Sequence, residues 1–278
     1  MKIGIVTDST ADIPAWFLEE YKIHVIPVII VLDGKEYVDG ITITREEFYN
    51  RLPALKTPPT TAAPSIGDFS ASYETLLSQG CEHVVSIHIA GTLTTMLNVA
   101  RQAAKEFEGK VTCVDSGSLS LGIGFQVLAA AEAADFGLQA VLDAIQSNRR
   151  RLQVAAALDT MEYLRRGGRV PAVVARLGGA LSIKPVVELI EGVVKPVSAV
   201  RTTRQADERM LDLLLRQGKL ERLAVMHTNA ERRARLLLDG AMARSPQAMP
   251  REILFSNVTA VIGAHLGPNA VGFAAVRK

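Results

Sequence analysis

The sequence predicts an α/β protein of two domains, with a mainly parallel sheet in the N-terminal domain and an α+β arrangement in the C-terminal domain. Three observations predict this fold class. The chain has 278 residues, of which 48% are hydrophobic, and this is longer than most single domains. In the first half, short β-branched runs alternate with helical runs, as in βα units. After about residue 158 this alternation changes, so we place the domains at residues 1–159 and 160–278.

Short β-branched runs before residue 160 are predicted to be the strands of the parallel sheet. Each run is apolar and is bounded by polar or turn-forming residues. These runs are KIGIVT, IHVIPVIIV, HVVSIHI, VTCVDS and QVAAAL.

Two capping signals predict where helices begin. In TREEF, the Thr44 hydroxyl can accept from the Glu47 amide while the Glu47 carboxylate accepts from the Thr44 amide. Ser65, followed three residues later by Asp68, predicts a helix through FSASYETLLSQG, and Gly80 predicts its end.

The remaining segments are predicted to be loops and a second set of extended runs. PALKTPPTTAAPS, residues 53–65, contains four prolines and has no helical or alternating period, so it is predicted to be a long loop of the kind that often binds ligands. SIKPVVELIEGVVKPVSAVRT is typical of a hairpin that turns at Glu191 and Gly192. Three later runs, LAVMHT, REILFS and AVIGAHLG, alternate with helical segments such as ERRARLLLDGA.

The composition excludes several classes of protein. A net charge of +2 provides no general attraction to nucleic acid or to a membrane surface. No uninterrupted apolar stretch reaches the ~18 residues of a membrane helix, and the N-terminal apolar run is too short for a signal peptide. Cys81 and Cys113 lie in or beside apolar runs, without a CxxC pattern, as small thiols in a reducing compartment do. We therefore expect a soluble, cytoplasmic protein.

Asp8 follows the first strand in GIVTDSTADI, and two interpretations are open. Phosphatases of the haloacid-dehalogenase type place a nucleophilic carboxylate at the end of a first strand. That chemistry needs a second acid two residues later, and here this residue is Thr10. The structural alternative is that Asp8, Ser9 or Thr10 caps the helix through AWFLEEY, with Pro14 in its first turn. The DST sequence favours the cap.

Two hydroxyl-rich stretches could bind an anion. TPPTTAAPS contains Thr61 and Ser65, and IAGTLTTMLNVA contains Thr94 and Thr95 where a strand passes into a helix. Hydroxyls beside a helix N-terminus supply donors for a carboxylate or a phosphate. Taken alone, either stretch fits ordinary capping and Ser/Thr turns better.

The basic residues and His265 have weaker patterns. His265 precedes a Gly-Pro turn in AHLGPNAVG, and a lone histidine is usually structural unless an acidic ligand lies nearby. YLRRGGRVP, which contains Arg169, and AVRTTRQ, which contains Arg201 and Arg204, could bind phosphate or form solvated turns. The sequence has no P-loop, HExxH, Cys/His array or GxSxG motif, so no catalytic residue and no metal ligand is predicted.

Six segments, taken in order, resemble the DegV family of bacterial fatty-acid-binding proteins, which present an acyl chain to a fatty-acid kinase. Any one of them is a weak signal, but six at the expected spacing over nearly the whole chain are a strong one. The segments are IVTDSTADIP, IPVIIVLDGKEYVDGITITREEFYNRL, VDSGSLSLGIG, LRRGGRV, LSIKPVVELIEGVVKPVSAVRTTRQA and IGAHLGP. The resemblance implies that the C-terminal domain encloses an apolar lipid tunnel.

The resemblance also implies a site for the fatty-acid carboxylate. In the family, hydroxyls from two loops and the histidine of an HxGP segment hold this group. The matching residues are Thr61, Thr94 and His265, and Thr95 and Ser65 belong to the same two loops. The chain departs from the family pattern, with fewer supporting hydrogen-bonding groups, at Ala62, Ala63, Ala90, Gly91 and Asn269.

The partners implied by the resemblance are a long-chain fatty acid and a separate kinase that makes the acyl-phosphate. Arg201 matches an arginine that docks the kinase, and Arg169 is a second candidate for the same surface. The structural alternative for Arg201 is an ion pair with Asp207. No cofactor and no nucleic acid is expected, and the role is compatible with transient membrane contact. Two other functions stay open: an Asp8-dependent small-molecule phosphatase or phosphotransferase using Mg²⁺, and a lipid-responsive interaction protein without a kinase.

Overall fold

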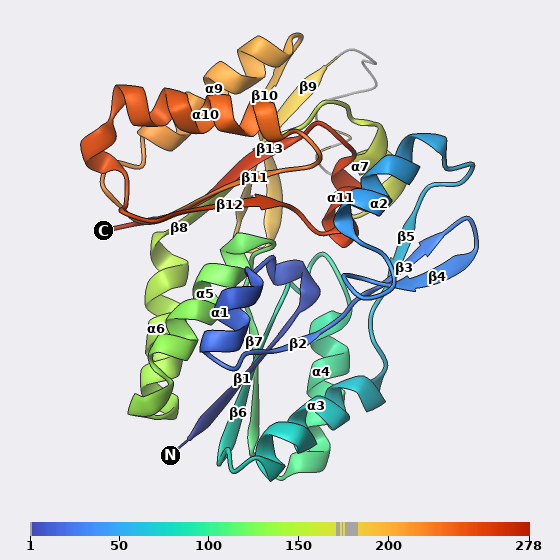
Figure 1. The fold of residues 1–278 in the computed structure, drawn as a ribbon, viewed down its shortest axis with the longest axis vertical. Helices are drawn as coiled ribbons and strands as arrows, with labels where there is room; N and C mark the ends of the chain where they lie inside the picture. Colours follow the sequence, from blue (N-terminus) through green and yellow to red (C-terminus); the bar gives the residue numbers. More distant parts are fainter. Residues whose placement is uncertain (1, 171–172, 174, 176–182) are drawn as a thin grey trace.

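The computed structural model describes residues 2–170, 173, 175 and 183–278, which form three β-sheets surrounded by helices (Figure 1). A four-stranded sheet occupies the lower half of the view and a six-stranded sheet the upper half. A three-stranded sheet lies at one side. The predicted α/β fold class is confirmed. Of the segments singled out above, Pro171, Leu181 and Ser182 lie outside the described residues.

The four-stranded sheet is parallel and has the order β2–β1–β6–β7. Strands β1 and β6 are buried along their whole length because helices cover both faces of the sheet. Helices α3 and α4 contact one face and α5 the other. The bounds are β1 (Ile3–Asp8), β2 (His24–Ile26), β6 (His83–His88), β7 (Val111–Asp115), α3 (Ile66–Ser78), α4 (Met96–Ala104) and α5 (Leu121–Glu132).

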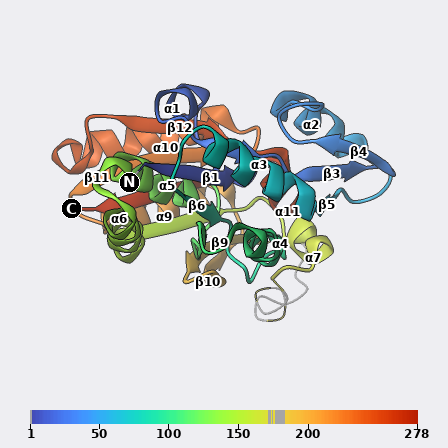
Figure 2. The same cartoon turned by 90° about the horizontal axis from the view of Figure 1, so that it is seen from below.

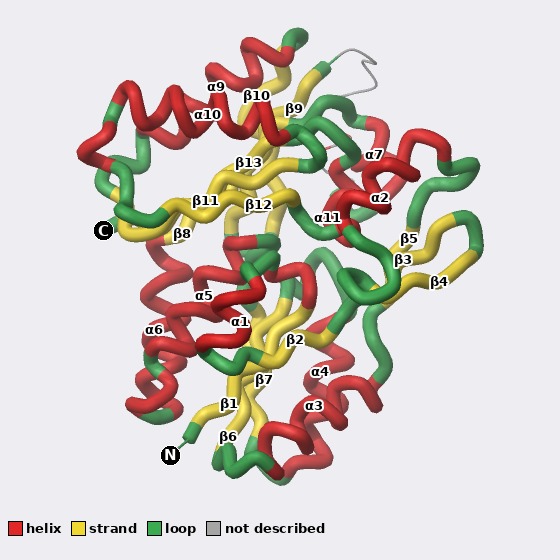
Figure 3. The backbone as a smooth tube through the Cα atoms, viewed as in Figure 1, coloured by secondary structure: helices red, strands yellow, loops and turns green. Residues whose placement is uncertain are grey.

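The six-stranded sheet has the order β10–β9–β8–β13–β11–β12; β11 and β12 are parallel and the other neighbours antiparallel. Helices α9 and α10 lie on one face, and α5 and α6 on the other (Figure 3). In the central strand β13, Phe273 faces α9 and α10 while Ala274 faces α5. The bounds are β8 (Leu152–Ala157), β9 (Lys184–Ile190), β10 (Val193–Val200), β11 (Leu220–His227), β12 (Ile253–Asn257), β13 (Val271–Arg277), α6 (Leu138–Arg151), α9 (Thr203–Leu215) and α10 (Glu231–Arg244).

The three-stranded sheet is antiparallel and has the order β4–β3–β5. Helix α11 contacts β3, β5, α2 and α7, and this group of elements lies at one side of the molecule (Figure 2). The bounds are β3 (Ile29–Leu32), β4 (Lys35–Val38), β5 (Thr60–Ala62), α2 (Arg45–Arg51), α7 (Glu162–Gly167) and α11 (Ala260–Leu266).

Helix α5 joins the two large sheets. Nine of its twelve residues are buried, because it contacts β1 and β6 on one side and β8, β11 and β13 on the other. A Cβ atom at Gly124 would lie 2.8 Å from the Ala11 carbonyl oxygen, so the close approach of α5 to the turn that follows β1 requires glycine there. One hydrophobic core therefore includes both Ile5 of β1 and Val276 of β13.

Within the described residues, the remaining helices are α1 and five short 3₁₀-helices. They are α1 (Ala15–Glu20), η1 (Ser9–Ala11), η2 (Leu52–Ala54), η3 (Lys105–Phe107), η4 (Ala134–Phe136) and η5 (Pro246–Ala248). Among the residues that the structure describes, no helix is both long and apolar enough to span a bilayer.

Several predicted segments fold differently from expectation. IHVIPVIIV is not one strand: β2 and β3 belong to different sheets, since Pro27 between them cannot donate to a ladder. The loop predicted at residues 53–65 contains strand β5, which exists because it pairs with β3. AVIGAHLG contains helix α11, whose residues 260–264 are all buried, so no helical period was visible.

QVAAAL forms β8, which is a strand as predicted. It pairs with β9 and β13 in the six-stranded sheet, called the mixed sheet below because it has parallel and antiparallel neighbours, and does not join the parallel sheet. β8 precedes residue 159, whereas both of its partners follow it. The domain division at residues 159 and 160 stays a prediction.

The predicted helix caps are present with one change. Thr44 Oγ1 accepts from the Glu47 amide at 3.1 Å, as expected, but the Glu47 carboxylate pairs with Arg51 and not with the Thr44 amide. Ser65 and Asp68 form the full reciprocal box, in which the Ser65 amide donates to Asp68 at 2.8 Å.

An ion pair between the buried Asp12 and the partly exposed Arg45 attaches α2 and α11 to the turn that follows β1. The fully buried Asp12 carboxylate lies 3.0 Å from the Arg45 guanidinium, and it accepts from the Thr259 amide at 2.8 Å and the Ser120 hydroxyl at 2.5 Å. Burial raises the pKa of Asp12 to about 6, against the opposing effect of Arg45. Arg45 therefore favours the ionised form of Asp12.

We expect Arg45→Met to lower the free energy of unfolding by about 2–3 kcal/mol at pH 7, because a buried carboxylate loses its counter-charge. The raised pKa means that the folded state takes up a proton before the unfolded chain does, whose Asp pKa is near 3.8. The loss should therefore shrink as the pH falls from 7 towards 4. Urea unfolding at several pH values measures it. Arg51→Met, which removes an exposed ion pair, is the control, and equal losses in both variants would contradict the prediction.

Candidate functional site

A cavity of about 550 Å³ lies where the loops at the carboxyl ends of β1 and β6 meet the six-stranded sheet and helix α11. Aliphatic side chains form most of its wall. Residues from both predicted domains line it: Thr10, Val28, Thr61, Ala62, Ala63, Ile89, residues 91–96, Asn98, Leu119, Val154, Ala155, Ala156, Leu164, Gly167, Arg169, Val170, Val187, Glu188, Leu189, Val194, Val261, Ile262, His265 and Leu266. The resemblance implies an apolar tunnel inside the C-terminal domain, whereas this cavity is lined by residues from both sides of the predicted boundary at residues 159 and 160.

Thr61 and His265 come together in this cavity although they are 204 positions apart in the sequence. Thr61 Oγ1 in β5 lies 3.4 Å from His265 Nε2 in α11. His265 Nδ1 is buried and has no partner within the described residues. The pair therefore offers a hydroxyl and an imidazole whose hydrogen-bonding capacity is not used up by the protein.

His265 is neutral at physiological pH. Burial, with a smaller contribution from the positive charge of Arg169, lowers the pKa of His265 to about 4. A neutral imidazole has one N–H donor and one acceptor nitrogen, so His265 can donate one hydrogen bond to an anion without carrying a charge of its own.

The backbone of Gly167 lies directly against the His265 ring. A Cβ atom at residue 167 would lie 2.6 Å from His265 Nδ1, too close for any side chain. The end of α7 therefore packs directly on the imidazole. Sequence reasoning singled out the RRGGR turn for its arginines and missed this contact, because the close approach of α7 and α11 is tertiary.

Thr94 and Thr95 line the same cavity at the N-terminus of α4. Thr94 Oγ1 accepts weakly from the Met96 amide at 3.4 Å, which leaves its hydroxyl proton for another acceptor. Thr95 occupies the N-cap position without a side-chain capping bond. In the described part of the chain, the amides of Thr94 and Thr95 have no acceptor, and donors at a helix N-terminus favour an anion.

Ser65, the fifth predicted carboxylate ligand, does not line the cavity. Its exposed hydroxyl is engaged with Asp68 in the cap of α3, donating at 2.7 Å and accepting from the Asp68 amide at 3.2 Å. In this structure Ser65 is therefore not placed to contact a ligand in the cavity.

The two arginines predicted to dock a partner lie in different settings. Arg169 is exposed yet lines the cavity, and its guanidinium donates to the Gly167 carbonyl at 2.7 Å. Arg201 is exposed after β10, and its guanidinium has no ion pair within the described residues. The alternative pairing with Asp207 is wrong, because Asp207 lies 2.6 Å from Arg233.

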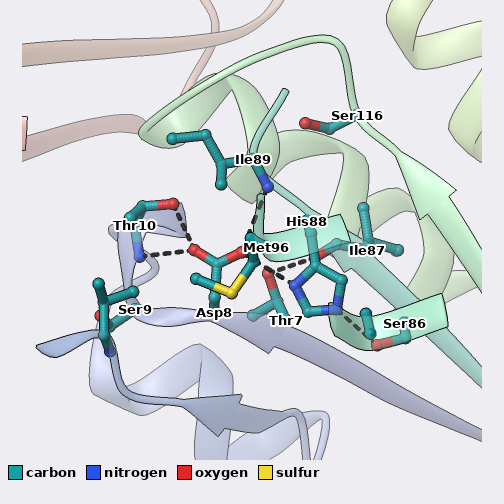
Figure 4. Close-up of polar contacts among 12 residues, drawn as sticks. Thr7, Asp8, Ser9, Thr10, Ser86, Ile87, His88, Ile89, Met96 and Ser116 are labelled. Carbon is teal, nitrogen blue, oxygen red and sulfur yellow. Dashed lines mark hydrogen bonds and ion pairs between the residues drawn. The ribbon is translucent and has the colours of Figure 1, made fainter. Parts of the chain in front are cut away.

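Asp8 is fully buried, and each of its two carboxylate oxygens accepts two hydrogen bonds (Figure 4). One oxygen accepts from the Thr10 amide at 3.0 Å and from the Thr10 hydroxyl. The other accepts from the Ile89 amide at 3.2 Å and from His88 Nδ1 at 2.9 Å. The predicted cap is thus only partly right: Asp8 caps the 3₁₀-helix η1, whereas α1 begins after Pro14 without a side-chain cap.

The buried polar chain continues from Asp8 in a Ser-His-Asp arrangement. His88 Nε2 lies 2.6 Å from Ser86 Oγ, which accepts from the Tyr73 hydroxyl at 3.0 Å. Ser86 and His88 are fully enclosed, so no substrate can reach the serine oxygen. Asp8 is equally enclosed, which leaves no face of its carboxylate for nucleophilic attack. In the described ranges, no cluster of three or more His, Cys, Asp or Glu side chains could hold a metal ion.

The low pKa of His265 predicts that the free energy of unfolding depends on pH. The unfolded histidine, with a pKa near 6.5, takes up a proton that the folded state does not accept until about pH 4. The free energy of unfolding should therefore fall between pH 6.5 and 4 by up to about 3 kcal/mol from this group. Because the His265→Asn variant lacks this titrating group, its free energy of unfolding, measured by urea titration, should fall less over that pH range than that of the natural chain. Parallel curves for the two proteins would contradict the prediction.

Comparison with known proteins matches this chain along its length. The family model described as "Uncharacterised protein, DegV family" matches residues 2–278. A DegV domain-containing protein of Streptomyces coelicolor is 34% identical over 275 residues, covering 97% of this chain and 96% of the relative. Protein DegV of Bacillus subtilis is 31% identical over 279 residues and covers 98% of both chains.

Solved structures match the whole fold. A fatty-acid-binding DegV family protein from Thermus thermophilus has a TM-score of 0.92 and 34% identity, with both chains covered completely. DegV of Bacillus subtilis, a fatty-acid-binding protein, has a TM-score of 0.88 and 30% identity, again over the whole of both chains. The family model and these relatives span the parallel sheet, the mixed sheet and the cavity between them, and the chain therefore belongs to the DegV family.

Proposed function

We propose that this protein binds a long-chain fatty acid and presents its carboxylate to a separate fatty-acid kinase. The observation that carries this proposal is the Thr61–His265 pair in a cavity whose wall is otherwise mostly aliphatic. Fatty-acid binding by the related proteins from Thermus thermophilus and Bacillus subtilis supports it.

The cavity suits an acyl chain. Its volume of about 550 Å³ lies in the usual range of ~300–1,000 Å³ for small-molecule sites. Each buried methylene contributes roughly 0.8 kcal/mol, so the chain of a long fatty acid supplies most of the affinity. The head group then needs to be oriented and hydrogen-bonded, because an unpaired buried carboxylate would cancel part of that gain.

The head group is held by neutral donors in this proposal. Thr61, Thr94 and His265 each supply one donor. The amide and hydroxyl of Thr95, which have no partner among the described residues, lie at the same helix end as Thr94. Arg169 adds a positive charge at the cavity wall without being buried. Thr95 and Arg169 are exposed, so this end of the cavity lies at the protein surface, where a kinase can reach a partly buried carboxylate.

Presentation to a kinase requires a docking surface outside the cavity. Arg201 is exposed, without an ion pair in the described part of the chain, and is available to an acidic surface of a partner. Delivery of the lipid would involve transient contact with a membrane or with another lipid carrier.

Mass spectrometry of the protein purified from cells tests the proposed function directly. We expect a co-purifying acyl chain released on denaturation. An empty protein with a Mg²⁺-dependent phosphatase activity that is lost in Asp8→Asn would overturn the proposal in favour of the enzymatic alternative.

We expect Thr61→Ala and His265→Ala each to weaken fatty-acid binding by about 1–3 kcal/mol, since each removes a hydrogen bond from a desolvated carboxylate. Isothermal titration of the delipidated proteins with palmitate measures this loss. Thr60→Ala is the matched control, because Thr60 is the exposed neighbour in the same strand and does not line the cavity. Unchanged affinity in both site variants would place the head group elsewhere.

We expect Arg201→Ala to retain palmitate but to lose most acyl-phosphate formation with the cognate kinase, because the side chain lies outside the cavity lining. Binding and phosphorylation assays on one preparation separate the two effects. Arg244→Ala, an exposed change at the end of α10, is the control. If lipid binding and thermal stability fall together and turnover falls only in proportion, Arg201 has a structural role.

A further inference from the structure

The loop of residues 89–95, which carries Thr94 and Thr95, lies between two aspartates of the parallel sheet. Its strand β6 has β1 and β7 as neighbours. Asp8 is the last residue of β1, and Asp115 is the last residue of β7. Because the three strands are parallel, both carboxylates lie at the edge of the sheet where this loop begins.

Three successive amides of this loop are held by the protein itself. The Ile89 amide donates to Asp8 at 3.2 Å, and the Ala90 amide donates to the Ser118 carbonyl at 2.9 Å. The Gly91 amide is shared between both oxygens of Asp115 at 3.3 Å. These amides are therefore not available to a ligand in the cavity.

The neighbouring contacts fix the same loop from outside. Asp115 also accepts from the Gly117 amide at 2.8 Å, and the Thr92 hydroxyl donates to the Gly192 carbonyl. A Cβ atom at Gly91 would lie 3.2 Å from the Asp115 carboxylate, so the approach of the carboxylate to this amide is close. The loop then turns, with the Leu93 amide donating to the Ala90 carbonyl.

We propose that Asp8 and Asp115 are positioning residues that clamp the start of this loop and thereby aim Thr94 and Thr95 at the ligand carboxylate. This inference rests on the proposed function. By binding the amides of Ile89 and Gly91 from opposite sides, the carboxylates fix the backbone before Thr94, so its hydroxyl proton and the next amides remain directed to the cavity. Four hydrogen bonds satisfy the enclosed Asp8 carboxylate, so it can hold the Ile89 amide in a site closed to water.

Asp8→Asn and Asp115→Asn test the clamp. In each variant an NH₂ group replaces an oxygen that now accepts backbone N–H bonds, so two donors face each other. We expect amide exchange, measured by NMR, to accelerate about tenfold at Ile89 in Asp8→Asn and at Gly91 in Asp115→Asn. Asp135→Asn, the same change at an exposed site, is the control.

A comparison of two ligands separates positioning from general damage to the structure. Palmitate and 1-hexadecanol have the same chain, but only palmitate carries the carboxylate. We expect palmitate to bind about tenfold more weakly to both variants and hexadecanol to change less than about twofold. Equal losses for the two ligands, or unchanged palmitate affinity despite faster exchange, would overturn the clamp.

Two further results keep the tests distinct. If the natural chain binds no palmitate, the proposed function fails. Amide exchange at Ile89 and Gly91 then tests the clamp by itself, and unchanged exchange at both amides would overturn it. If the fully buried Asp8 cannot be replaced without unfolding, Asp115→Asn decides the question, because Asp115 is only partly buried.

Discussion

The burial of helix α5 between two sheets is the constraint on which the rest of the structure depends. This helix is apolar around most of its circumference, so a single sheet cannot cover it. The parallel sheet covers one side and β8, β11 and β13 the other. As a result, the loops at the carboxyl ends of β1 and β6 lie next to the mixed sheet. The cavity lies at this junction between the two sheets.

At this junction the carboxylates of Asp8 and Asp12 are buried away from water, and neighbouring groups of the protein donate hydrogen bonds to them. Asp8 accepts four hydrogen bonds, and Asp12 is held by Arg45 together with Thr259 and Ser120. Since an unpaired buried carboxylate is strongly unfavourable, these contacts restrict where the loops and α11 can lie. The same contacts that satisfy the aspartates therefore hold the elements that carry His265 and the loop with Thr94.

Particular segments show how far the sequence could be read. Continuous β-branched runs are typical of strands buried on both faces, and they predict β1 and β6, whose residues are all buried. The run VTCVDS predicts β7 in the same way, although the residues of this strand at the edge of the sheet are only partly buried. The pattern of AVIGAHLG does not indicate a helix, because residues 260–264 of α11 are all buried and a helix without a polar face shows no period. The pattern of IHVIPVIIV does not separate β2 from β3, because the two halves are alike in composition and differ in the sheet that each joins.

The sequence by itself determined the fold class, the caps of α2 and α3 and, through six motifs in register, the family. These features depend on residues close together in the chain or on recognisable local patterns. Only the tertiary structure decided that Thr61 meets His265, that Gly167 packs on the imidazole and that Ser65 stays outside the cavity. Those relations depend on how β5, α7 and α11 approach one another in space, and this approach is set by burial and by the pairing of polar groups across large sequence separations.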